Sequence, residues 1–168
     1  MIPSMSSSQV TVTAHAAGST DAMAEAASIW ASAKARRDEA PVPDTVEKSL
    51  TGIRHRMGMD GATLLLVERD AQAVAFALLA PRDNAVEVFY VAVHADHWGG
   101  GLATHLLRAI ADHAQRAGHS TLELWVIEDN HRAISTYERA GWNATDELQT
   151  QPSGRTERRL RRHVGGRP

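Results

Sequence analysis

The sequence predicts an α/β (α+β) fold, in which helices flank one central sheet. The main observation is the stretch 86–117, where a mostly apolar and β-branched run leads into a glycine-rich turn and then into apolar residues at helical spacing. Strand-like and helix-like segments follow one another along nearly the whole chain. Its 168 residues, 43% of them hydrophobic, suffice for one compact domain. We expect that domain over residues 9–164, with a flexible polar tail at 1–8 and a short tail at 165–168.

The first third of the chain predicts a strand and two helices. Residues 9–15 alternate in polarity as a strand does, and residues 21–37 form an alanine-rich helix capped by a residue at 19–20. Acidic residues come early and basic residues late in this helix, as the helix dipole favours. A proline-rich break ends it, and a second helix begins at 44–45 and runs to about residue 57.

The rest of the chain alternates strands with two further helices. The predicted strands are 62–68, 72–80, 86–93, 121–127, 142–148 and 155–164, and the predicted helices are 102–117 and 130–139. Turns near 69–70 and 152–154 make hairpins of the strands that they join. Gly118 and Gly141 end the two helices. The resulting order is β-α-α-β-β-β-α-β-α-β-β.

Composition excludes several classes of protein. The chain has no cysteine, which rules out a disulfide framework, a cysteine nucleophile and cysteine-based zinc sites. Its nine histidines are scattered without metal-ligand spacing, so we expect no metal. It has no apolar run of the roughly 18 residues that a membrane span needs, and no basic-then-apolar signal at the N-terminus. We therefore expect a cytoplasmic protein with no membrane partner.

Charge is unevenly distributed. Residues 155–168 hold six arginines and one glutamate, whereas residues 1–154 hold 12 basic and 19 acidic residues, a net charge of −7. The acidic body disfavours nucleic acid and mildly favours a cationic substrate. The arginines could form a nucleic-acid-binding arm, but on a terminal strand we expect a solvated face.

Three consecutive glycines, Gly99, Gly100 and Gly101, stand between the strand and the helix of the central stretch. A helix start leaves backbone N–H groups without partners and carries partial positive charge, and glycine lets the backbone approach an anion closely. The turn therefore predicts a phosphate site. Leu102 follows where a P-loop needs lysine, and Thr104 stands where a dinucleotide fingerprint needs glycine or alanine, so both of those classes are excluded.

Residues 93–103, Val-His-Ala-Asp-His-Trp-Gly-Gly-Gly-Leu-Ala, resemble motif A of the GCN5-related N-acetyltransferases (GNAT), V-x-P-x-x-[RQ]-G-x-G-x-[GA]. Ala95 replaces the usual proline and Trp98 the usual arginine or glutamine. The element order is also that of the family, so the resemblance covers nearly the whole chain. It implies the acyl-CoA N-acyltransferase fold, with a mixed, mostly antiparallel central sheet flanked by helices.

The resemblance also implies how acetyl-CoA would be held as cosubstrate. In the family, backbone N–H groups of the motif bind the pyrophosphate, and the pantetheine arm pairs with the fourth strand where it splays from the fifth. The residues carried over are Val91, Ala92, Val93, Trp98, Gly99, Gly100, Gly101, Leu102, Ala103 and Thr104.

A second motif lies in residues 126–142 and resembles the family pattern V-x-x-x-N-x-x-A-x-x-x-Y-x-x-x-G-F, with Trp142 for the phenylalanine. The resemblance implies that Asn130 contacts the cofactor arm and that Tyr137 is the general acid near the sulfur. Seven residues are nearly two helical turns, so both side chains can face one side. The alternatives are that Asn130 only caps a helix and that Tyr137 only packs.

Glu87 is the leading candidate for the base that deprotonates the acceptor amine. A carboxylate on an apolar central strand would be desolvated and its pKa raised, and the position matches the acidic residue that serves some family members through water. The alternatives are an exposed glutamate or a structural ion pair. Glu123, His94 and His97 are substitutes. Trp125 stands where members that acetylate ribosomal proteins carry glutamate, which fits a small amine or aromatic acceptor, although it could equally be core.

The sequence thus predicts an N-acetyltransferase that moves an acetyl group from acetyl-CoA to an amine, expected to be a small molecule. Without cysteine, direct transfer in a ternary complex is expected. The acceptor is expected to contact residues 37–45, and we allow for a homodimer. The alternative is a non-catalytic sensor of CoA or acyl-CoA with the same fold, for which Ala95 and Trp98 leave room. A nucleic-acid-binding protein would rest only on the arginine-rich end.

Overall fold

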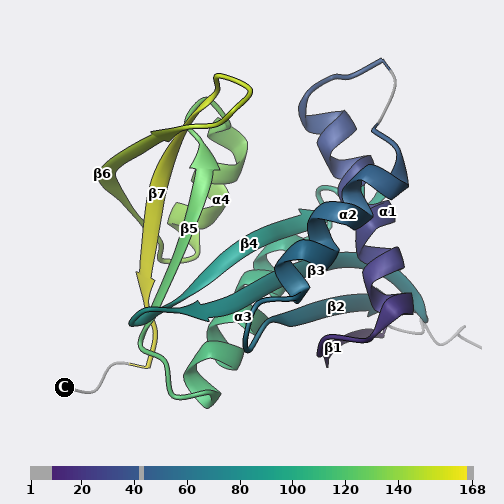
Figure 1. The fold of residues 1–168 in the computed structure, drawn as a ribbon, viewed down its shortest axis with the longest axis horizontal. Coiled ribbons are helices and arrows are strands. Elements are labelled where there is room, and N and C mark those ends of the chain that lie inside the picture. Colours follow the sequence, from purple (N-terminus) through teal and green to yellow (C-terminus); the bar gives the residue numbers. More distant parts are fainter. Residues whose placement is uncertain (1–8, 42–43, 166–168) are drawn as a thin grey trace, which may run out of the picture.

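The computed structural model describes residues 9–41 and 44–165. Its elements are β1 (Val10–His15), α1 (Thr20–Arg37), α2 (Val46–Met57), β2 (Thr63–Arg69), β3 (Gln72–Arg82), β4 (Ala85–Val93), the 3-10 turn η1 (Ala95–His97), α3 (Leu102–Arg116), β5 (Thr121–Ile127), α4 (His131–Arg139), β6 (Asn143–Thr150) and β7 (Thr156–His163). The strands form one seven-stranded sheet in the order β1-β2-β3-β4-β5-β7-β6 (Figure 1). Neighbouring strands are antiparallel except for the parallel pair β4–β5. The predicted mixed, mostly antiparallel sheet is confirmed.

Every predicted helix and strand is present, and only η1 is additional. Helix starts follow the capping residues: Thr45 accepts a hydrogen bond from the N–H of Lys48, and Asn130 from that of Ala133. The predicted tail at 1–8 and residues 166–168 of the C-terminal tail lie outside the described residues. Among the helices described, none is long and apolar enough to cross a membrane.

The sheet separates two hydrophobic cores. Helices α3 and α4 pack on one face, where Leu106, Ile110 and Trp142 are buried. Helices α1 and α2 pack on the other face, where Ile29 and Ile53 are buried against strands β2 to β4 (Figure 1). Because α1 and α2 pack mainly on this part of the sheet, the same face of β5 and β7 is left to line a site.

Strands β4 and β5 pair over only three residues each, Val86–Val88 with Leu122–Leu124. Beyond these pairs β4 continues to Val93 and β5 to Ile127 without pairing with one another. Phe89 is a β-bulge, since Leu79 pairs with Val88 and Leu78 with Tyr90, and a bulge bends its strand. The two strands therefore splay apart, which forms the gap that the family resemblance implied.

Candidate active site

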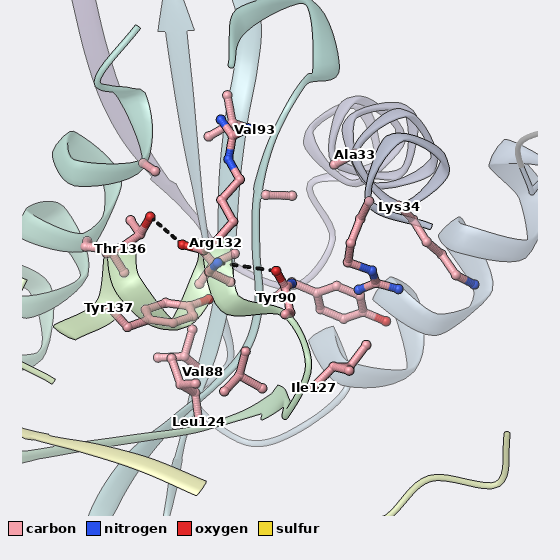
Figure 2. Close-up of a pocket in the computed structure, with 18 of the residues that line it drawn as sticks. Ala33, Lys34, Val88, Tyr90, Val93, Leu124, Ile127, Arg132, Thr136 and Tyr137 are labelled. Carbon is pink, nitrogen blue, oxygen red and sulfur yellow. Dashed lines mark hydrogen bonds between the residues drawn. The ribbon is translucent and has the colours of Figure 1, made fainter. Parts of the chain in front are cut away.

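A cleft of about 800 Å³ lies in the gap between β4 and β5 and extends to both faces of the sheet. Side chains from α1, α2, α3, α4 and β7 complete its walls. Figure 2 shows those of Lys34 on α1 and of Arg132 and Tyr137 on α4. It brings together most of the sequence-predicted site residues, namely Val91, Ala92, Val93, Trp98, Gly99, Gly101, Leu102, Ala103, Thr104, Asn130 and Tyr137. Gly100 and Glu87 are not among its lining residues.

The glycine turn presents backbone N–H groups to this cleft. Gly99 and Gly101 have φ angles of +85° and +78°, a conformation that favours glycine. Gly101 caps α3 without a side chain, and the N–H groups of residues 99–104 have no hydrogen-bond partner among the described residues. Unpaired N–H groups at a helix start attract an anion, so the geometry fits a phosphate. Beside the turn, the guanidinium of Arg69 lies 3.7 Å from where a Cβ on Gly100 would be.

Trp98 brings cationic side chains to the same turn. Its indole N–H donates a hydrogen bond to the Val93 carbonyl at 2.7 Å, which fixes the ring. The guanidinium groups of Arg36 and Arg132 lie 4.4 and 4.5 Å from the ring centroid, within cation–π range. Arg36 also donates to the Ala95 carbonyl at 2.5 Å. Trp98, at the motif position where arginine or glutamine is usual, therefore provides an aromatic ring on which two arginines stack.

Tyr137 lies on α4 and faces the cleft beside Val88 and Leu124 (Figure 2). Its ring packs at a steep angle on Trp142, with centroids 5.8 Å apart. Its hydroxyl has no hydrogen-bond partner among the described residues. Burial raises the pKa of Tyr137, so the phenol keeps its proton at neutral pH. The group is therefore a protonated donor that faces a cavity.

Asn130 begins α4 and lines the cleft. Its Oδ1 accepts the Ala133 N–H at 3.3 Å, so its role as a helix cap is confirmed. A contact with the cofactor arm stays a prediction, and the cap does not conflict with it because the amide NH₂ group is not used for capping.

Glu87 occupies a different place. It is 4% exposed, and its Oε2 lies 2.9 Å from Nη1 of Arg82, with Arg159 at 4.0 Å. It lines a second, polar hollow of about 720 Å³ together with Glu123 and Arg161. Of its two predicted roles, this geometry favours the structural ion pair, and the role of base stays a prediction.

The predicted substitutes for Glu87 are divided between sites. Glu123 pairs with Arg159 and Arg161 in the second hollow. His94 accepts the Asp96 N–H at 3.2 Å and lies outside the cleft, whereas His97 lines it. Within residues 9–41 and 44–165, no group of three or more His, Asp or Glu side chains could hold a metal ion.

The prediction of a solvated arginine face is wrong for Arg159. Its side chain is only 18% exposed, because β7 pairs with β5 and directs this residue toward Glu87 and Glu123. Burial lowers the pKa of the Arg159 guanidinium, which stays charged at neutral pH.

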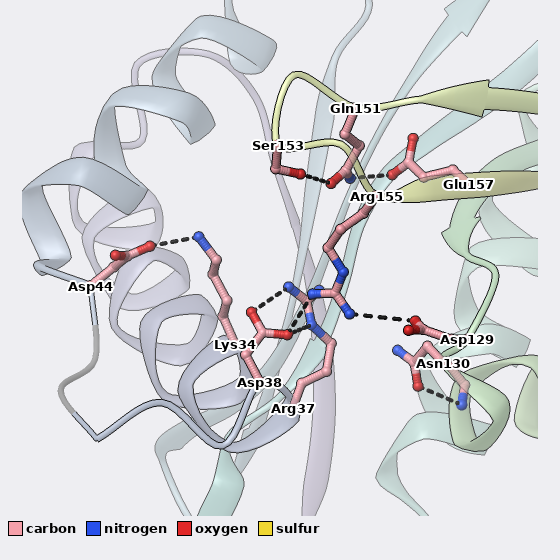
Figure 3. A network of polar contacts seen from close by, with 11 residues as sticks. Lys34, Arg37, Asp38, Asp44, Asp129, Asn130, Gln151, Ser153, Arg155 and Glu157 are labelled. Carbon is pink, nitrogen blue, oxygen red and sulfur yellow. Dashed lines mark hydrogen bonds and ion pairs between the residues drawn. The ribbon is translucent and has the colours of Figure 1, made fainter.

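Of residues 37–45, which were expected to contact the acceptor, Arg37 lines the cleft, and it pairs with Asp38 at 2.9 Å. Sequence reasoning missed several other charged residues of the cleft, among them Lys34, which pairs with Asp44 at 2.6 Å. Arg155 also reaches Asp38, so it links the turn between β6 and β7 to the end of α1 (Figure 3). The other charged lining residues that were missed are Arg56, Arg132, Arg139 and Glu157. None of them belongs to a motif, and only the topology brings them together.

Comparison with known proteins finds relatives in one family. The sequence model described as "Acetyltransferase (GNAT) family" matches residues 26–142. A mycothiol acetyltransferase from Nocardiopsis dassonvillei is 29% identical over 116 residues, which is 69% of this chain and 34% of that protein. The curated relatives are longer, and the matched region spans between 28% and 34% of their length.

Solved structures share the fold. Ribosomal-protein-S18-alanine N-acetyltransferase from Escherichia coli has a TM-score of 0.69 at 18% identity, over 94% of this chain and 97% of that one. PaiA N-acetyltransferase from Thermoplasma acidophilum, in complex with coenzyme A, has a TM-score of 0.66 at 11% identity, over 93% and 99% of the two chains. At these identities the likeness shows the fold alone, and it confirms the predicted acyl-CoA N-acyltransferase fold.

Proposed function

The chain belongs to the acetyltransferase (GNAT) family, and from this premise we propose that it is an N-acetyltransferase. It would move the acetyl group of acetyl-CoA directly onto an amine, expected to be a small molecule, within a ternary complex. One observation carries the proposal: the splay of β4 from β5 leaves a single cleft, lined both by the glycine turn and by a protonated Tyr137.

The glycine turn and the free edge of β4 would bind the cosubstrate. The N–H groups of residues 99–104 would bind the pyrophosphate, and Arg132 on Trp98 adds positive charge beside them. Val91, Ala92 and Val93 lie where β4 no longer pairs with β5, so their backbone is available to an extended cofactor arm. When bound, acetyl-CoA supplies an acetyl group activated as a thioester.

Tyr137 supplies a proton to the leaving sulfur in this proposal. Its raised pKa keeps the phenolic proton in place until negative charge develops next to it. The walls around the hydroxyl, Val88 and Leu124, are apolar, which strengthens a hydrogen bond made there. With no cysteine in the chain, a thioester intermediate on the protein is excluded.

Glu87 remains the proposed route for the amine proton, as the resemblance implies. Its pairing with Arg82 and its place outside the cleft weigh against a direct contact with the amine. A role through water is therefore the form of the proposal that fits the geometry, and it is tested below. A cytoplasmic setting and a homodimer likewise stay predictions from the sequence.

The phosphate site can be tested with two matched charge substitutions in α3. Ala103 lines the cleft in the first turn of α3, so Ala103→Glu would place a carboxylate beside the pyrophosphate without straining a glycine. His105→Glu adds the same charge two residues later, at an exposed position outside the cleft. Calorimetry with CoA should show binding weakened at least a hundredfold in the first variant and nearly unchanged in the second. Equal affinity in both would contradict the site.

Acceptor-dependent release of CoA thiol tests transfer itself. We expect thiol release from acetyl-CoA to rise when a panel of amines is added, and intact-protein mass spectrometry to show no stoichiometric acetyl adduct. Tight CoA binding without thiol release for any amine would favour the non-catalytic sensor of the same fold.

A further inference from the structure

Of the charged side chains that line the cleft, Arg56, Arg132, Arg139 and Glu157 have no oppositely charged partner among the described residues. Resting on the proposed transfer reaction, we propose that the acceptor carries an anionic group besides its amine, with Arg56 binding the anion and Glu157 the ammonium. This differs from the cationic acceptor that the overall charge of residues 1–154 favoured, because the charges that line a cleft matter more than the net charge of the body.

Arg56 stands in the last turn of α2 and is half-buried. Its guanidinium lies 4.3 Å from the centroid of the Phe89 ring, and both residues line the cleft. It forms no ion pair with the described residues. Stacking on Phe89 fixes the planar group while its N–H donors stay available. Such a group suits bidentate binding of a carboxylate.

Glu157 is at the start of β7, on the opposite wall of the cleft from α2. The amide nitrogen of Gln149 donates to its Oε2 at 2.6 Å. The amide nitrogen of Gln151 donates to its Oε1 at 2.5 Å (Figure 3). Neutral amides hold the carboxylate in place without cancelling its charge. Among the described residues that line the cleft, it is the only carboxylate, so it is the natural partner for an ammonium.

The other cations of the cleft are already engaged or lie elsewhere. Lys34 and Arg37 pair with Asp44 and Asp38. Arg132 stacks on Trp98 at the glycine turn, and Arg139 donates to Thr136 on its own helix. Arg56 is therefore the cation that the α2 wall offers to an acceptor.

Aromatic side chains line the same cleft as the two charges. Trp30, Phe89, Tyr90 and Trp125 all line the cleft, and Tyr90 packs edge-on to Trp30 with centroids 5.0 Å apart. Such walls favour an acceptor with an apolar or aromatic body. A compact amine that carries a carboxylate on an aromatic ring offers an anion for Arg56, an ammonium for Glu157 and a flat apolar body for the aromatic walls.

The test compares two acceptors that share a body, phenethylamine and 4-(2-aminoethyl)benzoate. We expect the wild type to favour the carboxylate compound by about tenfold to a hundredfold in kcat/KM, the range for one hydrogen-bonded charge. Arg56→Gln should erase this preference and Arg56→Lys should restore part of it. Arg54→Gln, an exposed arginine of the same helix outside the cleft, should keep it.

Glu157→Gln should lower kcat/KM for both amines by a similar factor, because both carry the ammonium. Asp146→Asn serves as its control, since Asp146 is exposed, lies on the same hairpin and is outside the cleft. Calorimetry of the CoA-loaded protein with 4-(2-aminoethyl)benzoate gives a second readout, in which Arg56→Gln should weaken binding by the same tenfold to hundredfold.

The outcomes separate this inference from the proposed function. Acetylation of both amines at equal rates, unaffected by Arg56→Gln, would overturn the acceptor class and leave the transferase standing. If neither amine is acetylated, calorimetry decides: Arg56-dependent binding of the benzoate would support the anion site, and its absence would overturn it.

Discussion

The two ends of the β4–β5 pair differ in what they do. At one end, Val86–Val88 pair with Leu122–Leu124, and the carboxylates of Glu87 and Glu123 are neutralised by Arg82, Arg159 and Arg161. At the other end the same strands splay, and the gap is lined by a protonated phenol and by charges without ionic partners. The paired end thus compensates its charges, whereas the splayed end combines ion pairs such as Lys34–Asp44 with charges that have no ionic partner, and it is to the latter that we assign a proposed function.

The local structure of β4 explains where the paired strands begin to splay apart. The bulge at Phe89 bends β4 directly after the last pair with β5. Tyr90, which follows it, directs its hydroxyl toward Gly52 of α2, where a Cβ would lie only 2.8 Å away. Together with Trp30, this aromatic packing holds the splayed half of β4 against the helices.

The largest effect is expected at the splayed end, from Tyr137→Phe. Loss of a general acid typically costs 10²–10⁴-fold, so kcat should fall by about that factor while the dissociation constant of CoA stays near the wild-type value. Removing one hydroxyl that has no partner in the described structure should leave the melting temperature almost unchanged. Full turnover under conditions where chemistry limits the rate would show that Tyr137 is not the acid.

At the paired end, by contrast, Glu87→Gln is expected to lower the stability of the fold. Removing a buried carboxylate that accepts from Arg82 should lower the free energy of unfolding by about 2 kcal/mol, the scale of a charged hydrogen bond. Glu147→Gln is a control in the same cluster, because Glu147 pairs with Arg159 at 3.5 Å but is 59% exposed, and it should cost less than about 1 kcal/mol. Denaturant titrations measure both.

The same variant decides the chemical role of Glu87. As the proposed base acting through water, Glu87 should account for a rise of kcat/KM with pH in the wild type, and we expect Glu87→Gln to lose this rising limb. A variant that loses stability but keeps the wild-type pH profile would show that Glu87 serves only its ion pairs.

The sequence allowed the fold to be predicted because its signals are local. Alternation, helical spacing and the glycines at 99–101, 118 and 141 located every helix and strand. The glycine turn, Asn130 and Tyr137 were found through motif spacing, and the structure gathers them in one cleft. Arg56 and Glu157 could not be found, because they share no spacing and line the same cleft only through the packing of α2 and β7 in the fold.

Arg159 shows the same limit for charged residues. A run of arginines indicates a strand face, but whether that face is solvated depends on which strand pairs with it. Pairing of β7 with β5 puts Arg159 beside two carboxylates that are more than 35 residues earlier in the chain.

A third expected effect concerns the turn that follows the splayed end of β4. Trp98→Ala should weaken CoA binding about tenfold, because Arg36 and Arg132 lose the ring on which they stack, and cation–π contacts contribute about 0.5–2 kcal/mol each. Turnover at saturating acetyl-CoA should change little. Arg132→Gln should reproduce part of the loss and reduce its dependence on salt. Unchanged affinity in both variants would mean that the backbone alone holds the phosphate.

The smallest effect is expected from Asp38, which links the end of α1 to the β6–β7 turn at the splayed end. A hydrogen bond from Arg37 is the main cause that lowers the pKa of Asp38 to about 2, burial acts against it, and Arg155 adds to the lowering. A carboxyl whose pKa is lower in the folded than in the unfolded protein stabilises the fold above the unfolded value, and this contribution disappears as pH falls through the folded one. Between about pH 4 and pH 2, the wild type should therefore lose more stability than Asp38→Asn, and near neutral pH the variant should be slightly the less stable. Urea titrations at several pH values in this range measure the difference. If the free energy of unfolding changes with pH equally in the two proteins, the link between α1 and the β6–β7 turn contributes nothing to stability, unlike the ion pairs of the paired end (Figure 3).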